Sequence, residues 1–246
     1  MDVGFHFRKI QNHWLKWASQ TNAKHFVIGI SGGKDSTVVA TLAAKLFGSH
    51  NVIGVFMPPY SKEDYEYAKE VVKELSVFSY NIDITKSVNS LYDNFIVDPT
   101  MDAEINLPAR IRMATLFLVA QTFGARVLNT CNLSENMVGY STLFGDSAGT
   151  YAPIHDYTVS EVIDLGRWLG IPEKFLVKPP SDGLCGKTDE ENLGVSYKDI
   201  DSYIRHGDGD PEVISKIVDL YEKNRFKLEL INVPHPNSGL VNYLID

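Results

Sequence analysis

Residues 25–48 constrain the fold most strongly, because they combine a short apolar run, a glycine-rich loop and a helical pattern in that order. The run HFVIGI (25–30) is nearly continuous in apolar residues, which is typical of a strand buried on both faces of a parallel sheet. The segment STVVATLAAKLFG (36–48) predicts a helix that ends at Gly48. A strand that leads through a loop into a helix is the first unit of a parallel α/β fold.

Apolar runs and amphipathic segments go on alternating along the chain. We predict further strands at 52–57, 78–84 and 125–130. We predict helices at 5–18, from Ser61 to about Leu75, at 106–123, at 132–139 and at 158–170. In the first of these helices, spacings of three and four place Phe7, Ile10, Trp14 and Trp17 on one face. This alternation predicts one α/β domain over residues 1–246, built as a doubly wound parallel sheet flanked by helices.

Local end signals refine two of these helices and the position of a site. Asn106 is the expected N-cap of the longest helix, with Pro108 in its first turn. Thr158 and Glu161 form a capping box at the start of the last predicted helix. Ligands of such sheets bind at the carboxyl ends of the strands. We therefore expect three loops to converge there, at 31–36, 57–61 and 130–135.

Composition excludes several classes of protein. The chain of 246 residues has a net charge of −8, which argues against a nucleic-acid binder with a broad basic face. Cys131 and Cys185 are far apart, so a disulfide framework or a cysteine-based metal site is not expected. The sequence has neither a long apolar run nor a signal-peptide pattern, so we expect no membrane association and a cytoplasmic location.

The segment ISGGKDST after the first strand has the composition of a phosphate-binding loop but fits neither common pattern. Aligning a Walker P-loop on Lys34 puts its first glycine on Ile28 and its magnesium-binding hydroxyl on Asp35. The glycines also have the wrong spacing for a dinucleotide loop. The loop still offers main-chain amides at a helix N-terminus, together with the hydroxyls of Ser31 and Ser36. A carboxylate beside such an anion site indicates a divalent cation that joins Asp35 to phosphate.

The motif SGGKDST resembles the S-G-G-x-D-S signature of the ATP pyrophosphatase superfamily, the PP-loop ATPases with an adenine nucleotide alpha hydrolase-like fold. Three further segments resemble ammonia-dependent NAD synthetase: NLPARIRMATL (106–116), NTCNLSENMVGYSTLFGDSAG (129–149) and PPSDGLCGKTDEENLGVSYKDIDSYI (179–204). The resemblance implies a homodimeric ligase with Mg²⁺ as its cofactor. That enzyme makes NAD⁺ from deamido-NAD⁺, ATP and ammonia through an adenylated nicotinate, and releases AMP and pyrophosphate.

The resemblance also implies roles for single residues. Contacts with ATP are expected at Gly29, Ile30, Ser31, Gly32, Gly33, Lys34, Asp35, Ser36, Thr130 and Ser181. Asp35 and Glu135 are the expected magnesium ligands, although an ordinary first-turn helix charge is the alternative for Glu135. Arg110 is expected to bind deamido-NAD⁺, whereas Arg112 points to another side of the same helix. Lys227 is the second expected contact with deamido-NAD⁺, and a solvated helix lysine is its alternative.

Two residues are predicted to be catalytic. Asp146, in a glycine-flanked loop, is expected to bind ammonium or to act as the general base, with an ordinary turn aspartate as the alternative. Many members of the family carry lysine where this chain has Val159, and often where it has Leu143. Either Lys34 supplies the missing positive charge to the phosphates, which we predict, or the affinity for ATP is lower.

Other functions fit the sequence less well. Another PP-loop ligase, such as a tRNA-modifying enzyme, would need a basic surface that the charge of −8 does not favour. A noncatalytic adenine-nucleotide sensor would not require both Asp35 and Glu135. A glutamine-dependent synthetase would need a separate amidase domain, which we do not expect in this chain.

Overall fold

The centre of the protein is a parallel sheet, seen in a computed structural model that describes residues 2–57, 62–177 and 188–228. In this part of the chain the sheet has four strands in the order β3-β2-β1-β4, and all neighbouring strands run parallel. The strands are β1 (Phe26–Gly29), β2 (Val52–Phe56), β3 (Phe78–Asn81) and β4 (Arg126–Val127). The predicted α/β fold with a parallel sheet is confirmed.

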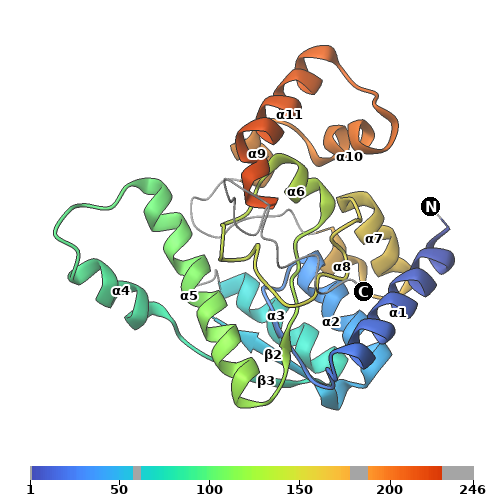
Figure 1. The fold of residues 1–246 in the computed structure, drawn as a ribbon, viewed down its shortest axis with the longest axis vertical. Coiled ribbons are helices and arrows are strands. Elements are labelled where there is room, and N and C mark those ends of the chain that lie inside the picture. The colour runs from blue at the N-terminus through green and yellow to red at the C-terminus, as the bar shows by residue number, and fades with distance from the viewer. Residues whose placement is uncertain (1, 58–61, 178–187, 229–246) are drawn as a thin grey trace, which may run out of the picture.

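Helices cover both faces of the sheet, with α5 on one side of the strands and α1 on the other (Figure 1). The longer helices are α1 (Val3–Gln20), α2 (Lys34–Phe47), α3 (Lys62–Leu75), α4 (Thr85–Asp93), α5 (Met101–Thr122), α6 (Leu133–Val138), α7 (Val159–Trp168), α10 (Tyr197–His206) and α11 (Pro211–Asn224). The short ones are α8 (Glu173–Leu176), α9 (Asp189–Leu193) and the 3₁₀ turns η1 (Ser49–Asn51) and η2 (Arg225–Leu228).

Two apolar cores follow from the alternation of side chains along β1. Phe26 and Ile28 point into the core shared with α1, α2 and α7, and both side chains are fully buried. Val27, between them, points the opposite way into the core formed with α5, where it joins Leu116 and Met113. Because β1 contributes side chains to both cores, it must be apolar on both faces. The near-continuous apolar run at 25–30 meets this requirement.

The helices that flank the Gly-rich loop form largely as predicted. On α1 the buried positions include Phe7, Ile10 and Trp14, the face expected from their spacing, and the ring of Trp14 stacks on Tyr151 at 4.9 Å between centroids. Helix α2 ends at Gly48, as predicted, but it begins at Lys34, two residues before the expected start. Lys34 and Asp35 consequently belong to the first helical turn instead of the loop. The predicted start of α3 at Ser61 lies outside the described residues.

Helix α5 differs from the prediction at its beginning. It starts at Met101 with Thr100 as the N-cap, so Asn106 is not the N-cap and Pro108 lies inside the helix. Pro108 has no N–H to donate to the carbonyl of Glu104, four residues earlier. The Tyr92 hydroxyl donates to that carbonyl instead, at 3.3 Å, so the helix tolerates the proline. The prediction failed because the compensating donor comes from α4.

The remaining strands and helices are confirmed with shorter or shifted ends. The predicted strand at 125–130 pairs with β1 only through Arg126 and Val127, and the chain then bends away after a single bridge between Leu128 and Tyr151. The predicted helices at 132–139 and 158–170 correspond to α6 and α7. Both begin with the capping box that places a glutamate three residues after an Asn or Thr N-cap.

The C-terminal helices form a third apolar cluster against α6. Helices α10 and α11 lie beyond the carboxyl end of the sheet and pack on α6 through Val138, Ile200 and Ile217 (Figure 1). The approach is closest at Gly139, whose φ is 65° and where a Cβ atom would lie 2.1 Å from Cβ of Asn224. A glycine is needed here for both its conformation and its size. These helices hold α6 in place above the strand ends.

Candidate functional site

The Gly-rich loop joins β1 to α2 and is held by its own hydroxyl groups. The main-chain N–H of Ser31 donates to Oγ of Ser36 at 3.3 Å, and the two hydroxyl oxygens lie 3.1 Å apart. Gly32 has a φ of 81°, a conformation that glycine adopts readily, and Gly33 is the N-cap of α2. The loop therefore leads into the N-terminus of a 14-residue helix and places two hydroxyls beside it, an arrangement that suits an anion.

Lys34 is buried at the start of α2, with 6% of its surface exposed. Its Nζ lies 2.9 Å from Oδ2 of Asp35 and 5.7 Å from the centre of the Tyr197 ring. Desolvation opposes protonation of Lys34, but attraction by Asp35, Glu135 and Asp189 raises its pKa, so the side chain is a buried ammonium.

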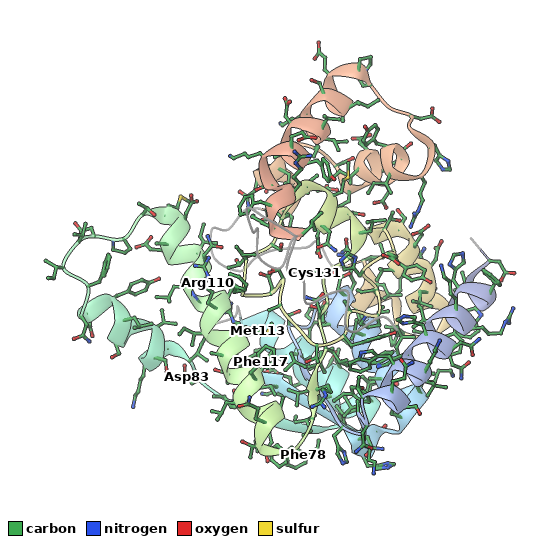
Figure 2. The ribbon with its side chains drawn as sticks, viewed as in Figure 1. Phe78, Asp83, Arg110, Met113, Phe117 and Cys131 are labelled. Carbon is green, nitrogen blue, oxygen red and sulfur yellow. The ribbon has the colours of Figure 1, made fainter. Side chains whose placement is uncertain are left out.

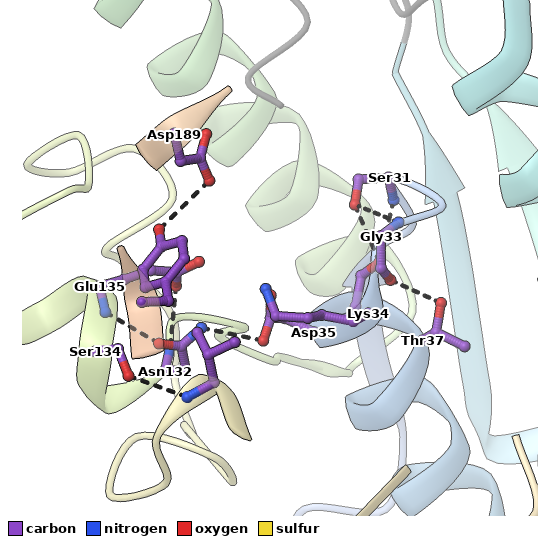
Figure 3. Close-up of polar contacts among 12 residues, drawn as sticks. Ser31, Gly33, Lys34, Asp35, Thr37, Asn132, Ser134, Glu135 and Asp189 are labelled. Atoms are coloured by element: carbon purple, nitrogen blue, oxygen red, sulfur yellow. Dashed lines mark hydrogen bonds and ion pairs between the residues drawn. The ribbon is translucent and has the colours of Figure 1, made fainter. Parts of the chain in front are cut away.

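Asn132 connects the loop to α6. Its Nδ2 donates to Oδ1 of Asp35 at 3.1 Å, and its Oδ1 accepts the main-chain N–H of Glu135 at 3.0 Å. The Glu135 carboxylate in turn accepts the main-chain N–H of Asn132 at 3.1 Å, which completes the capping box (Figure 3). Asn132 thus links the two carboxylates that the sequence predicted to follow different strands, through its side-chain amide to Asp35 and its main-chain N–H to Glu135.

The site concentrates negative charge in a partly buried environment. Desolvation and then repulsion from Asp35 raise the pKa of Glu135 well above its usual range, while Lys34 opposes this. Burial raises the pKa of the Tyr197 phenol, which therefore stays protonated and donates to Asp189 Oδ2 at 3.4 Å. Ionised together, Asp35 and Glu135 require compensating positive charge.

The residues present fit a magnesium ion that is completed by substrate. Within the described ranges no group of three or more His, Cys, Asp or Glu side chains could hold a metal ion. Magnesium usually takes only one or two carboxylates and fills its other positions with water and phosphate oxygens. Asp35 and Glu135, beside a loop that suits an anion, are such a donor set.

A second group of predicted residues surrounds the loop at 139–146. Arg110 lies on α5 (Figure 2). It donates from Nε to the carbonyl of Leu143 at 3.1 Å. Lys227, on η2, donates from Nζ to the carbonyls of Gly139 and Ser141 at 2.7 and 3.0 Å. Residues predicted to contact the acceptor nucleotide thus come from two distant segments and meet at one loop.

Asp146 braces the same loop while its side chain still reaches solvent. Its Oδ1 accepts the main-chain N–H of Thr142 at 2.7 Å. Desolvation by the surrounding protein raises the pKa of Asp146, although that hydrogen bond and the charge of Lys227 oppose the rise. A carboxylate with a raised pKa is better suited to accept a proton near neutral pH than an ordinary one.

The other predicted positions have less distinctive surroundings. Gly29 ends β1, and Ile30 is buried and donates its N–H to the carbonyl of Val55 at 3.0 Å. Thr130 is half-buried between β4 and α6. Ser181 lies outside the described residues. Arg112 donates to the carbonyl of Met57 at 3.3 Å, away from the bond made by Arg110, as the different helix faces predict.

Three contributors to the site were not predicted from the sequence. Asn132 bridges the carboxylates, and its signal was readable, since an asparagine followed three residues later by a glutamate predicts a capping box. Tyr197 covers Lys34 from α10. Asp201, also on α10, accepts hydrogen bonds from the Ser134 hydroxyl and the Ser160 N–H, so it ties the first turns of α6 and α7 together.

Two further observations limit the chemistry. Burial raises the pKa of the Cys131 thiol well above its usual range, so this cysteine is a neutral core residue and not a nucleophile. No helix in the described part of the chain is long and apolar enough to cross a membrane.

Fold and site together define a parallel α/β protein with a glycine-rich loop suited to an anion and a partly buried pair of carboxylates. The family model described as NAD synthase matches residues 7–231. A Pyrococcus furiosus protein named NH(3)-dependent NAD(+) synthetase is 37% identical over 199 residues, which are 80% of this chain and 77% of that protein. A protein of the same name from Carboxydothermus hydrogenoformans is 35% identical over 229 residues, or 90% and 94% of the two chains.

A solved structure extends the likeness to three dimensions. NMN synthetase from Francisella tularensis superposes with a TM-score of 0.89 at 30% identity, covering 96% of this chain and 99% of that chain. The chain belongs to the NAD synthase family. This assignment confirms the family predicted from the sequence motifs, and with it the class, a ligase of NAD biosynthesis.

Proposed function

We propose that the protein joins ammonia to the nicotinate carboxylate of deamido-NAD⁺ and uses ATP to activate that carboxylate, with AMP and pyrophosphate as by-products. The observation that carries the proposal is the Asp35–Asn132–Glu135 connection, which holds two partly buried carboxylates beside the Gly-rich loop. The names of the relatives and the family match support the same reaction.

The first step forms an acyl-adenylate. A nicotinate carboxylate has a pKa near ~4 and is already ionised at neutral pH, so no base is needed. One of its oxygens attacks the α-phosphorus of ATP, and the bond from that phosphorus to pyrophosphate breaks. The amides and hydroxyls of the loop orient the leaving phosphates, and Lys34, which directly follows the loop in the first turn of α2, is the proposed source of positive charge for them. Magnesium, when bound by Asp35 and Glu135, would supply further positive charge to phosphate oxygens.

The second step forms the amide. The nitrogen of ammonia attacks the acyl carbon, the bond from that carbon to AMP breaks, and the nitrogen loses a proton. Asp146 is the proposed acceptor of a proton from ammonium or from the attacking nitrogen. Arg110 and Lys227 hold the loop at 139–146, so we assign them to the binding of the acceptor nucleotide near that loop.

A second acceptor is favoured by one observation. The solved chain with a TM-score of 0.89 is named an NMN synthetase, which amidates at the mononucleotide level. Nicotinate mononucleotide presents the same reacting carboxylate, so the catalytic groups described above would serve either substrate. The alternative reading is therefore the same reaction on nicotinate mononucleotide, giving nicotinamide mononucleotide.

The deciding experiment supplies ATP and ammonium with either deamido-NAD⁺ or nicotinate mononucleotide and measures the amidated product, AMP and pyrophosphate. We expect a higher kcat/KM for deamido-NAD⁺, with AMP and pyrophosphate formed in equal amounts. A higher kcat/KM for the mononucleotide would establish the second reading. Formation of ADP and phosphate with either acceptor would overturn both.

The nitrogen donor and the assembly are tested separately. Ammonia-free glutamine should give no turnover, because ammonia is the proposed donor, and an equal rate with glutamine would contradict this. A homodimer in the cytoplasm also stays a prediction. Light scattering on the eluted protein should give a mass of about twice 27.5 kDa.

A further inference from the structure

The ammonium of Lys34 lies among the carboxylates that are assigned to the metal. It is paired with Asp35 at 2.9 Å and is attracted by Glu135 and Asp189, while the Tyr197 ring covers it at 5.7 Å from the ring centre. Figure 3 shows Lys34 and Asp35 adjacent at the first turn of α2, with Asn132 and Glu135 across from them. A buried ammonium in this position partly neutralises a group of negative charges.

Both oxygens of Asp35 are engaged. Oδ2 contacts Nζ of Lys34, and Oδ1 accepts a hydrogen bond from Nδ2 of Asn132 at 3.1 Å. Asn132 is also fixed as the N-cap of α6, so its amide is held from two sides. A divalent cation at Asp35 would repel the ammonium, since Lys34 is buried and Asp35 is only partly exposed, so water screens the two positive charges weakly.

Displacing Lys34 has a consequence for the rest of the site. Its side chain is more than nine-tenths buried, and a buried ammonium that loses its carboxylate is strongly destabilised unless another anion replaces that carboxylate. The loop at 31–33, which directly precedes Lys34, offers the N-terminus of α2 to an anion. The phosphates of a nucleotide bound there would be the replacement partner.

We infer that Lys34 is the internal counter-ion of the metal-binding carboxylates and that it makes binding of a divalent cation depend on bound polyphosphate. This inference rests on the proposed function for the assignment of Asp35 and Glu135. When the carboxylates hold the cation, the ammonium of Lys34 would pair with the phosphates instead. The cation and the polyphosphate therefore tighten each other's binding by the same factor. The protein thereby binds divalent cations weakly until a nucleotide is present.

The test measures binding of Mn²⁺, without nucleotide, by titration calorimetry to the wild type and to Lys34→Met. Removing the ammonium should tighten Mn²⁺ binding roughly tenfold or more, within the range of typical coupling between sites. Lys45→Met is the matched control, because Lys45 is an exposed lysine on the same helix, and its Mn²⁺ affinity should equal that of the wild type. Lys34→Gln, which keeps a hydrogen-bond donor without the charge, guards against a folding defect in Lys34→Met.

A second series adds the α,β-methylene analogue of ATP, which cannot be cleaved between its α- and β-phosphates. The analogue should tighten Mn²⁺ binding to the wild type far more than to Lys34→Met. Mn²⁺ also binds the free analogue in solution, but this background is the same for every variant and cancels in the comparison. Equal Mn²⁺ affinities of wild type, Lys34→Met and Lys34→Gln without nucleotide would overturn the inference. Unchanged Mn²⁺ binding by Asp35→Asn in both series would instead overturn the metal site on which the proposed function relies.

Discussion

The hydroxyl of Tyr92 donates a hydrogen bond to the main-chain carbonyl of Glu104 at 3.3 Å, and this bond links α4 to the first turns of α5. In an unbroken helix that carbonyl would accept the N–H of residue 108, which is a proline. Tyr92 thus supplies the donor that Pro108 lacks. Helix α5 carries Arg110, so the contact also positions a proposed nucleotide-binding residue.

Replacing Tyr92 by phenylalanine should lower the free energy of unfolding by about 0.5–1.5 kcal/mol, the usual contribution of one hydrogen bond. Urea unfolding measures it. In a Pro108→Ala background the same change should cost less, because residue 108 then has an N–H for Glu104. An equal loss in both backgrounds would show that Tyr92 acts through packing alone.

Asp201 should matter for both stability and the site. It accepts hydrogen bonds from the Ser134 hydroxyl and, at 2.8 Å, from the Ser160 N–H, and it is buried. Asp201→Asn removes a charged acceptor and turns an amide donor toward one of these donors, at an expected cost of about 1–3 kcal/mol. Asp208→Asn, at an exposed position, should stay within about 0.5 kcal/mol of the wild type in the same unfolding assay. Similar values for the two variants would contradict the role of Asp201.

Glu135 should make stability depend on pH in a defined direction. Its folded-state pKa is raised from the ordinary value of 4.5, so the folded protein binds more protons than the unfolded chain above that pH. Its contribution to stability is therefore present at low pH and is lost as the pH rises from 4.5 through the folded-state pKa. Unfolding in EDTA at several pH values should show a steeper decline for the wild type than for Glu135→Gln. Asp146 contributes with the same sign in both proteins, so parallel curves would contradict this prediction.

Asp146 can be separated into a charge and a hydrogen-bond acceptor. Asp146→Asn keeps an oxygen for the N–H of Thr142, so the protein should remain folded. If the carboxylate accepts a proton during amide formation, kcat with ammonium should fall about 10²–10⁴-fold. Asp146→Ala should lose stability as well, because the Thr142 N–H is left without its acceptor. Full activity of Asp146→Asn would leave Asp146 as a loop brace only.

The site residues that could be predicted from the sequence are those that directly follow a strand. Asp35 and Glu135 follow the first and fourth strands, and the parallel sheet brings their loops together, as the Asn132–Asp35 hydrogen bond confirms. The burial of Lys34 could not be predicted in this way. A lysine is normally solvated, and only the surrounding acids and the Tyr197 ring make a buried ammonium acceptable.

The fold shows the same division between local and distant causes. The capping box at Thr158 and the apolar face around Trp14 depend on neighbours in sequence, and both are confirmed. The start of α5 was placed wrongly, because Pro108 lies inside the helix and the donor that it lacks is replaced by Tyr92 from another helix. Helices α10 and α11 had readable signals that were not used, namely an N-cap serine at 196 and Asp210 followed by a proline.

The Asn132–Asp35 hydrogen bond joins residues 97 positions apart, and this distance along the chain has a consequence for how the protein acquires its site. Bringing residues so far apart together costs chain entropy before their contact can stabilise the structure. The helices α2 and α6, by contrast, form through contacts between residues that are close in sequence. Helical structure should accordingly return early during refolding, and Mn²⁺ binding only when β4 has docked beside β1. The candidate site is therefore expected to form late in folding. A nascent chain shorter than about 140 residues lacks a complete α6, so Glu135 cannot yet take its place beside Asp35.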